Sequence, residues 1–124
     1  MIQVLAIAGG GAIGALLRFW VSGWVYAVAG RAFPYGTLAV NVLGSLAIGF
    51  LYVWLLERVA GGVAWRAFLL IGLLGAFTTF STFSLETLNL IEAGQLGRAV
   101  ANMLLSVVLC VAAASIGVLI ARQL

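Results

Sequence analysis

The sequence predicts an all-α integral membrane protein with four transmembrane helices, the third of them broken near the bilayer centre. Composition gives the compartment: 65% of the 124 residues are hydrophobic, 7% are charged and the mean hydropathy is +1.27. Charged residues make up roughly 25% of a typical soluble domain. A hydrocarbon core of roughly 30 Å takes about 20 helical residues to cross, and the chain is long enough for four such crossings.

The predicted spans follow one another through short connections that hold most of the charge. They run from Ile2 to Val28, from Thr37 to Leu56, from Ala67 to Ile91 and from Ala99 to Ala121. No room remains for a second domain, so we expect one transmembrane domain over residues 1–124. The stretch after Met1 lacks a basic region and is too long for a signal-peptide core, so we expect the first span to be retained.

The third span is interrupted by a polar stretch, GAFTTFSTFS, from Gly75 to Ser84. Two adjacent β-branched residues, Thr78 and Thr79, lower the helical preference. In a bilayer, a helix interruption must be buried in protein or line an aqueous cavity. We therefore expect a break whose carbonyls and hydroxyls serve an ion. The alternative is an unbroken helix whose hydroxyls bond to their own preceding turns.

Polar side chains recur at four-residue spacing in two other spans. Thr37, Asn41 and Ser45 form one stripe of the second span, and Asn102 and Ser106 repeat the spacing in the fourth. Amide and hydroxyl donors without an acidic partner fit an anion better than a cation. Hydrogen bonding between helices is the alternative for each of them.

The third span also carries a phenylalanine series and a carboxylate. Phe77, Phe80 and Phe83 recur every third residue, which predicts one shared face. The positive edges of such rings could touch an anion, although phenylalanine stripes also serve packing. Glu86 follows in the same span, and intramembrane carboxylates are rare and usually functional.

Arg18 lies within the first span, on the same face as Gly10 and Gly14. A fixed cation at depth is costly unless it faces protein or water, and there it could draw anions into a vestibule. The alternative is a side chain that reaches back to the interface.

The arginines outside the first span give almost no orientation bias. One predicted face carries Arg58, Arg66 and Arg122, and the other carries Arg31 and Arg98. Because arginine in short loops sets membrane orientation, a count of three against two allows insertion both ways. Two copies in opposite orientations could form an antiparallel homodimer and supply the symmetry that larger transporters obtain from inverted repeats. One fixed orientation is the alternative.

Three motifs in this order resemble the Fluc or CrcB family of small dual-topology fluoride channels. They are Gly9-Gly10-x-x-Ile13-Gly14-Ala15-x-x-Arg18, Gly36-Thr37-Leu38-x-Val40-Asn41-x-x-Gly44-Ser45 and Gly75-x-Phe77-Thr78-Thr79-Phe80-Ser81-Thr82-Phe83-Ser84. The resemblance covers all four spans, and the last motif is highly specific. The chain departs from many relatives at Leu46, where a phenylalanine is expected.

The resemblance implies a passive fluoride-selective channel of the cytoplasmic (inner) membrane, built as an antiparallel homodimer with two pores. It implies roles for nine residues: Asn41 and Ser106 as pore donors, Phe80 and Phe83 as ring edges, Thr82 and Glu86 as pore-adjacent polar groups, Arg18 at the vestibule, and Gly75 and Thr78 as carbonyl ligands. Those carbonyls would hold a structural sodium ion at the dimer interface.

Other function classes fit the sequence less well. With no His, no Asp and a single Cys110, the chain offers few groups for acid–base or metal chemistry, so we do not expect an enzyme. The pI of 9.8 comes from six arginines on a membrane protein, so nucleic acid is not an expected partner. Two alternatives stay open: a small multidrug-type proton-coupled exporter, which needs a deep carboxylate, and an accessory membrane subunit.

Overall fold

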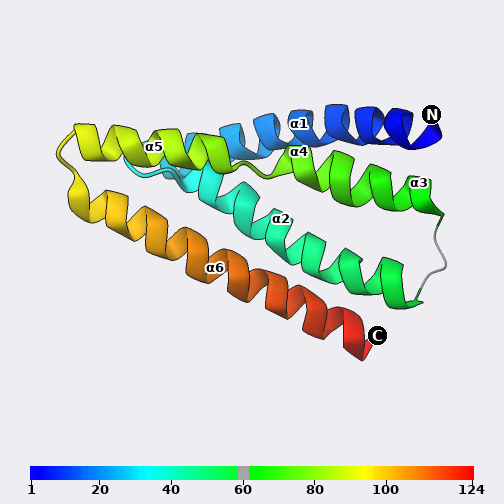
Figure 1. Cartoon of the computed structure of the whole chain (residues 1–124). Helices are drawn as coiled ribbons and strands as arrows, with labels where there is room; N and C mark the ends of the chain where they lie inside the picture. The colour runs from blue at the N-terminus through cyan, green and yellow to red at the C-terminus, as the bar shows by residue number, and fades with distance from the viewer. Residues whose placement is uncertain (59–61) are drawn as a thin grey trace.

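A computed structural model describes residues 1–58 and 62–124 of the chain. Within these residues, four helical stretches are long and apolar enough to cross a membrane: Ile2–Ala29, Tyr35–Glu57, Val63–Glu92 and Leu96–Gln123. They confirm the four predicted spans, whose ends differ by a few residues. Part of the predicted charged connection between the second and third spans, residues 59–61, lies outside the described residues. The spans run alternately up and down, so both termini lie at one end (Figure 1).

The spans divide into the following elements. The first span is α1 (Ile2–Ala29), and the second is α2 (Tyr35–Val53) continued by the π-helical segment η1 (Trp54–Arg58). The third contains α3 (Val63–Arg66), the π-helical segment η2 (Ala67–Leu74), α4 (Gly75–Phe77) and α5 (Phe80–Glu92), and the fourth is α6 (Leu96–Gln123).

The two connections at the end opposite the termini are tight turns. Each contains a glycine with positive φ, 84° at Gly30 and 73° at Gly94, a conformation that other residues rarely adopt. Pro34 stands directly before α2 and is buried. Arg98 near the start of α6 donates a hydrogen bond to the carbonyl of Ala32 in the α1–α2 connection (3.2 Å), so the two connections lie side by side.

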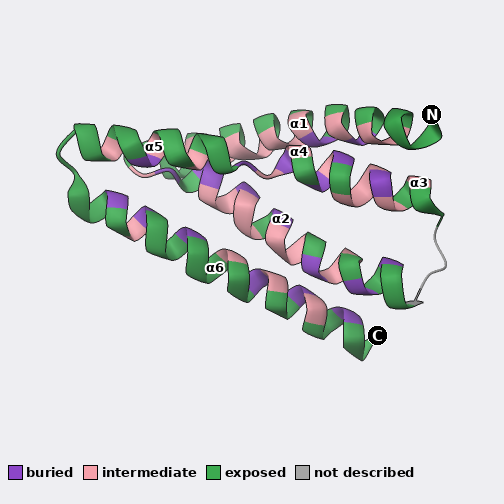
Figure 2. Ribbon diagram, in the orientation of Figure 1, coloured by how far each residue is buried: buried purple, intermediate pink, exposed green. Residues whose placement is uncertain are grey.

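Close helix contact depends on small residues. α2 packs mainly on α6, and a Cβ added at Gly49 or Gly117 would collide with the backbone of the facing helix, at Ala114 and Leu46 respectively. Gly10 of α1 meets the backbone of η2 in the same way. Buried positions gather on the facing sides of the helices, and the outer sides are exposed (Figure 2). Without a hydrophobic drive in lipid, such close backbone approach is what holds helices together.

We expect Gly117→Ala to destabilise the α2–α6 contact. The added methyl group must displace backbone atoms, which costs about 1–3 kcal/mol for an overpacked site. Thermal unfolding in detergent, followed by circular dichroism, measures the effect. Gly97→Ala on the same helix is the matched control, because nothing lies within 4 Å of the added Cβ there. Equal melting temperatures for the two variants would show that the contact at Gly117 is not tight.

Candidate functional site

The third span breaks at Thr78 and Thr79. Both residues are extended, with φ/ψ of −83°/159° and −152°/118°, between the end of α4 at Phe77 and the start of α5 at Phe80. The predicted break is therefore confirmed, and the unbroken helix is wrong. The expectation that Phe77 shares a face with Phe80 is also wrong, because the extended residues separate them onto two helices. Phe77 is buried, whereas Phe80 is 78% exposed.

Asn41 of α2 holds this break. Its Nδ2 donates to the carbonyl oxygen of Thr79 (3.0 Å), and its Oδ1 accepts from the N–H of Thr79 (2.8 Å). A backbone that leaves the helix loses its internal partners, and in the membrane another group must replace them. The side-chain amide replaces both partners at once. One N–H of the amide is used in this way, and the hydrogen bonds of the described residues include no partner for the second.

Thr79 also begins α5 as its N-cap. Its Oγ1 accepts from the backbone N–H of Thr82 (3.2 Å) and donates to the hydroxyl of Thr82 (3.0 Å). A side-chain oxygen at this position satisfies an N–H that the first helical turn cannot. Gly44 of α2 makes the close approach possible, because an added Cβ there would collide with the side chain of Thr78. The second half of the third span is thus oriented from α2.

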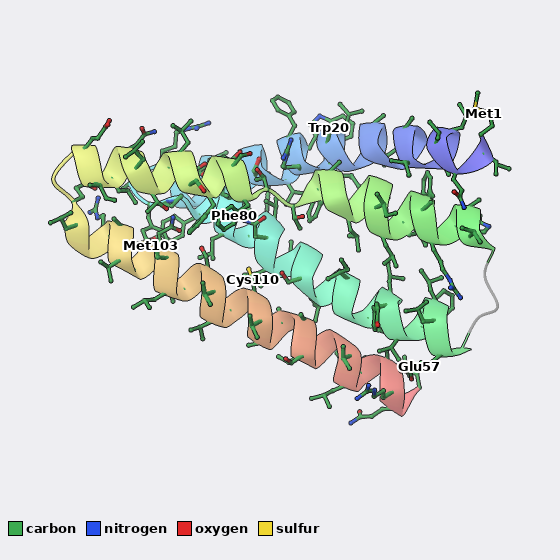
Figure 3. All side chains as sticks on the ribbon, viewed as in Figure 1. Met1, Trp20, Glu57, Phe80, Met103 and Cys110 are labelled. Carbon is green, nitrogen blue, oxygen red and sulfur yellow. The ribbon has the colours of Figure 1, made fainter. Side chains whose placement is uncertain are left out.

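An open groove of about 450 Å³ lies between α2, the break and α6. Six of the nine predicted site residues line it: Asn41, Gly75, Thr78, Phe80, Phe83 and Ser106. Phe80 at the start of α5 and Cys110 on α6, both labelled in Figure 3, are among the residues that line it. The predicted pore residues, which are up to 65 positions apart in sequence, therefore share one surface.

Two features of the groove suit an anion. The Phe80 and Phe83 rings lie with centroids 5.3 Å apart and planes tilted by 43°, so the rings do not stack face to face. The hydroxyl oxygen of Ser106 is buried and has no hydrogen-bond partner among the described residues. A buried hydroxyl without a partner is costly, and a bound anion would accept a hydrogen bond from it.

The backbone at the break has spare acceptors. Among the hydrogen bonds identified for residues 1–58 and 62–124, none ends on the carbonyl oxygen of Gly75 or Thr78. The N–H of Thr79, which would bond to Gly75 in a continuous helix, is bound to Asn41. The N–H of Thr82, which would bond to Thr78, is bound to Oγ1 of Thr79. Gly75 and Thr78 both line the open groove. Carbonyls of an unwound membrane helix are the ligands that coordinate Na⁺ in transporters. The two predicted carbonyl positions therefore fit a sodium ion.

The other three predicted site residues lie outside the groove. Arg18 and Thr82 line a smaller cavity of about 240 Å³, together with Thr37. Glu86 lines a third cavity near the end of the bundle. The structure thus separates the predicted vestibule arginine and the acidic residue from the phenylalanines.

Glu86 is held by hydroxyls. Tyr26 donates to its two carboxylate oxygens at 3.2 and 3.1 Å, and Thr37 donates to Oε1 at 2.7 Å. Charge-assisted bonds of this kind stabilise a carboxylate in a span. The sequence reasoning missed Tyr26. The available signal was a tyrosine in the last turn of a span, next to the connection that leads to the Thr37 stripe.

A second polar contact joins α5 to α6. Asn102 is 1% exposed and donates to the hydroxyl of Thr87 (2.9 Å), which donates to the carbonyl of Phe83 (2.8 Å). The four-residue spacing of Asn102 and Ser106 was the sequence signal, but Thr87 carried none. Because α5 bears Phe83 and α6 bears Ser106, this contact fixes how the two sides of the groove face each other.

The chain is similar to known proteins over nearly its whole length. Residues 5–118 match the protein family described as "CrcB-like protein, Camphor Resistance (CrcB)". The chain is 56% identical over 123 residues to a protein of Methylococcus capsulatus, 52% identical over 123 residues to one of Coxiella burnetii (strain Dugway 5J108-111), and 49% identical over 124 residues to one of Geobacter sulfurreducens. Each of these relatives is named "Fluoride-specific ion channel FluC".

These matches cover 99%, 98% and 100% of this chain respectively. The chain spans only 54% of the length of the Methylococcus relative, but 99% and 100% of the other two. The broken third span, the asparagine that brackets it and the whole-length similarity lead to one assignment: the chain belongs to the CrcB family.

Proposed function

We propose that this chain is a fluoride-selective channel that lets fluoride leave the cytoplasm passively across the inner membrane. The groove at the break carries the proposal. It brings a side-chain amide, the unpartnered hydroxyl of Ser106 and two phenylalanines to one surface. None of the residues lining that groove is charged. The names of the relatives supply the identity of the anion.

The groove offers several neutral hydrogen-bond donors and no strong charge, as a conducting site requires. The second N–H of Asn41 and the hydroxyl of Ser106 replace water hydrogen bonds of the ion, while the edges of Phe80 and Phe83 add a positive electrostatic contact. No full positive charge lines the groove to trap the anion. A conducting site must bind well enough to admit an ion and weakly enough to release it.

The remaining predicted residues extend this pathway. Arg18 attracts the anion into the cavity that it lines with Thr37 and Thr82, and hydroxyls there supply further donors. Glu86 stands beyond them and shares Thr37 as a hydrogen-bond partner. The proposed route therefore follows the linings of the groove and of the cavity at Arg18, which share Thr79.

A second copy of the chain closes the groove in this proposal. In one copy the groove is open, and Phe80, which lines it, is 78% exposed. An antiparallel homodimer fits the balance of arginines in the connections. It encloses two equivalent pores, one for each groove. The spare carbonyls of Gly75 and Thr78 from the two copies then hold a structural sodium ion at the dimer interface.

The alternatives have less support. A proton-coupled exporter needs a carboxylate in its binding cavity, but the groove lining contains none, and Glu86 is bound to Tyr26 and Thr37 in another cavity. An accessory subunit would not need the unpartnered hydroxyl of Ser106. Nor do the relatives suggest an enzyme, since they are named as ion channels.

Ion efflux from liposomes that contain only the purified chain tests the proposal. Liposomes are loaded with potassium fluoride or potassium chloride, and valinomycin balances the charge while ion-selective electrodes follow the anions. We expect rapid fluoride efflux and retention of chloride, with protein-free liposomes as the baseline. Efflux equal to that baseline, or equal efflux of both anions, would contradict a fluoride-selective channel.

Dual topology is a separate prediction. A single cysteine introduced at Ala32, in a Cys110→Ala background, should react with a membrane-impermeant maleimide from both sides of the membrane. A population labelled half from outside and half only after permeabilisation is expected, because three arginines against two give no strong bias. Labelling from one side alone would remove the antiparallel dimer.

The carbonyl site predicts a selective effect of Gly75→Leu. An added Cβ at Gly75 meets only the carbonyl oxygen of Leu70 at 3.8 Å, an ordinary contact, so one copy should keep its helical content. The bulk of leucine at an exposed carbonyl site should nevertheless loosen the dimer. Circular dichroism measures helicity, and light scattering in detergent measures assembly with and without sodium. A variant that dimerises like the parent would count against a sodium site between the copies.

A further inference from the structure

The end of the bundle that holds the two tight turns contains a cavity of about 510 Å³ that shares no lining residue with the groove. Arg31 and Pro34 line it from the α1–α2 turn, Asn89 from α5, Ala93 and Gln95 from the α5–α6 turn, and Arg98 from the start of α6. Two segments that are far apart in the sequence thus surround one polar space.

Both arginines are held at the rim of this cavity. Arg98 uses its Nη1 to donate to the carbonyl of Ala32 and to the side-chain oxygen of Gln95, each at 3.2 Å. The guanidinium carbon of Arg31 lies 4.8 Å from the ring centroid of Tyr26, in cation–π range. These contacts orient the two side chains and reduce the entropy lost when they bind a ligand.

Most donors of the pair remain available. A guanidinium group has five N–H donors, and among the described residues only those on Nη1 of Arg98 have hydrogen-bond partners. Two oriented guanidinium groups that face one space are suited to bidentate contact with a phosphate group.

The acid that lines the cavity does not neutralise this pair. Glu86 already accepts from Tyr26 and Thr37, and no ion pair joins it to Arg31 or Arg98 within the described residues. Glu92, the other acidic residue near this end, is not among the lining residues. Two positive charges therefore face one negative charge whose oxygens are already hydrogen-bonded.

The position of the pair relative to the spans points to the ligand. α1 ends at Ala29 and α6 begins at Leu96. Arg31 therefore lies two residues beyond the end of α1, and Arg98 lies two residues after the start of α6. This is the level of the lipid headgroups, and basic pockets between membrane helices bind phosphate-bearing headgroups there. We propose that this cavity binds a phosphate group, carried by an anionic phospholipid or free in solution.

Binding of a defined phosphate-bearing lipid tests the proposal. The full chain in maltoside detergent is titrated with short-chain dihexanoyl-phosphatidylglycerol, and calorimetry gives the dissociation constant for the parent, Arg31→Gln and Arg98→Gln. Arg122→Gln is the matched control, since it removes the same charge from the other end of α6, about 36 Å away by helical rise. Melting temperatures of the lipid-free variants verify that each is folded.

We expect Arg31→Gln and Arg98→Gln each to weaken binding about tenfold, which corresponds to about 1.4 kcal/mol, and Arg122→Gln to change it less than about twofold. Competition by inorganic phosphate identifies the phosphate alone as sufficient, whereas failure to compete identifies the lipid as the source. Two results would overturn the site: parental affinity in both cavity variants, or equal weakening by Arg122→Gln.

Discussion

Replacement of Asn41 by leucine should abolish fluoride efflux and lower stability more than any other single change proposed for this chain. The substitution removes both hydrogen bonds to Thr79. The N–H and carbonyl of Thr79, a residue that is only 8% exposed, then have no partner. Each unsatisfied buried group costs about 1–3 kcal/mol, so the total loss should be about 2–6 kcal/mol. The ion would also lose an amide donor.

Thermal unfolding in detergent and liposome efflux measure the two effects of Asn41→Leu. Gln123→Leu is the matched control, since it also removes a side-chain amide but at an exposed position near the end of α6. It should melt and transport like the parent. If Asn41→Leu did so too, Asn41 would neither support the break nor line the pathway.

Phe80→Ile and Phe83→Ile should each slow fluoride efflux about tenfold while the fold survives. Isoleucine keeps the bulk and apolarity but removes the ring quadrupole. If the lost ring contact raises the free-energy barrier to ion passage by about 1.4 kcal/mol, the efflux rate falls by one order of magnitude. Phe80 is 78% exposed in one copy, so its replacement should leave the stability of the helices nearly unchanged.

The control for the phenylalanines is Phe50→Ile on α2. Phe50 also pairs with another aromatic residue, Trp54, with centroids 6.5 Å apart, but it does not line the groove. Efflux by this variant should equal that of the parent. Parental efflux in both groove variants would make Phe80 and Phe83 packing residues and leave Asn41 and Ser106 as the proposed contacts to the ion.

The predictions from sequence succeeded where the structure depends on neighbouring residues and failed where it depends on contacts between helices. The break was predictable because adjacent Thr78 and Thr79 act on their own backbone. The placement of Phe77 was not, because a spacing rule assumes one continuous helix, and two extended residues change the direction of the chain. Glu86 looked like one member of the same helical series, yet its partners, Tyr26 and Thr37, come from two other helices.

The sequence by itself determined the compartment, the four spans, the place of the break and, through three ordered motifs, the family. These follow from hydrophobic length and from residues that act within a few positions of one another. Only the tertiary structure decided that Asn41 brackets Thr79, that Ser106 keeps an unpartnered hydroxyl, and that Arg31 meets Arg98 at one cavity. Such pairings depend on the rotation and crossing of packed helices, here set by backbone contacts at Gly49 and Gly117, and periodicity along one helix does not specify them.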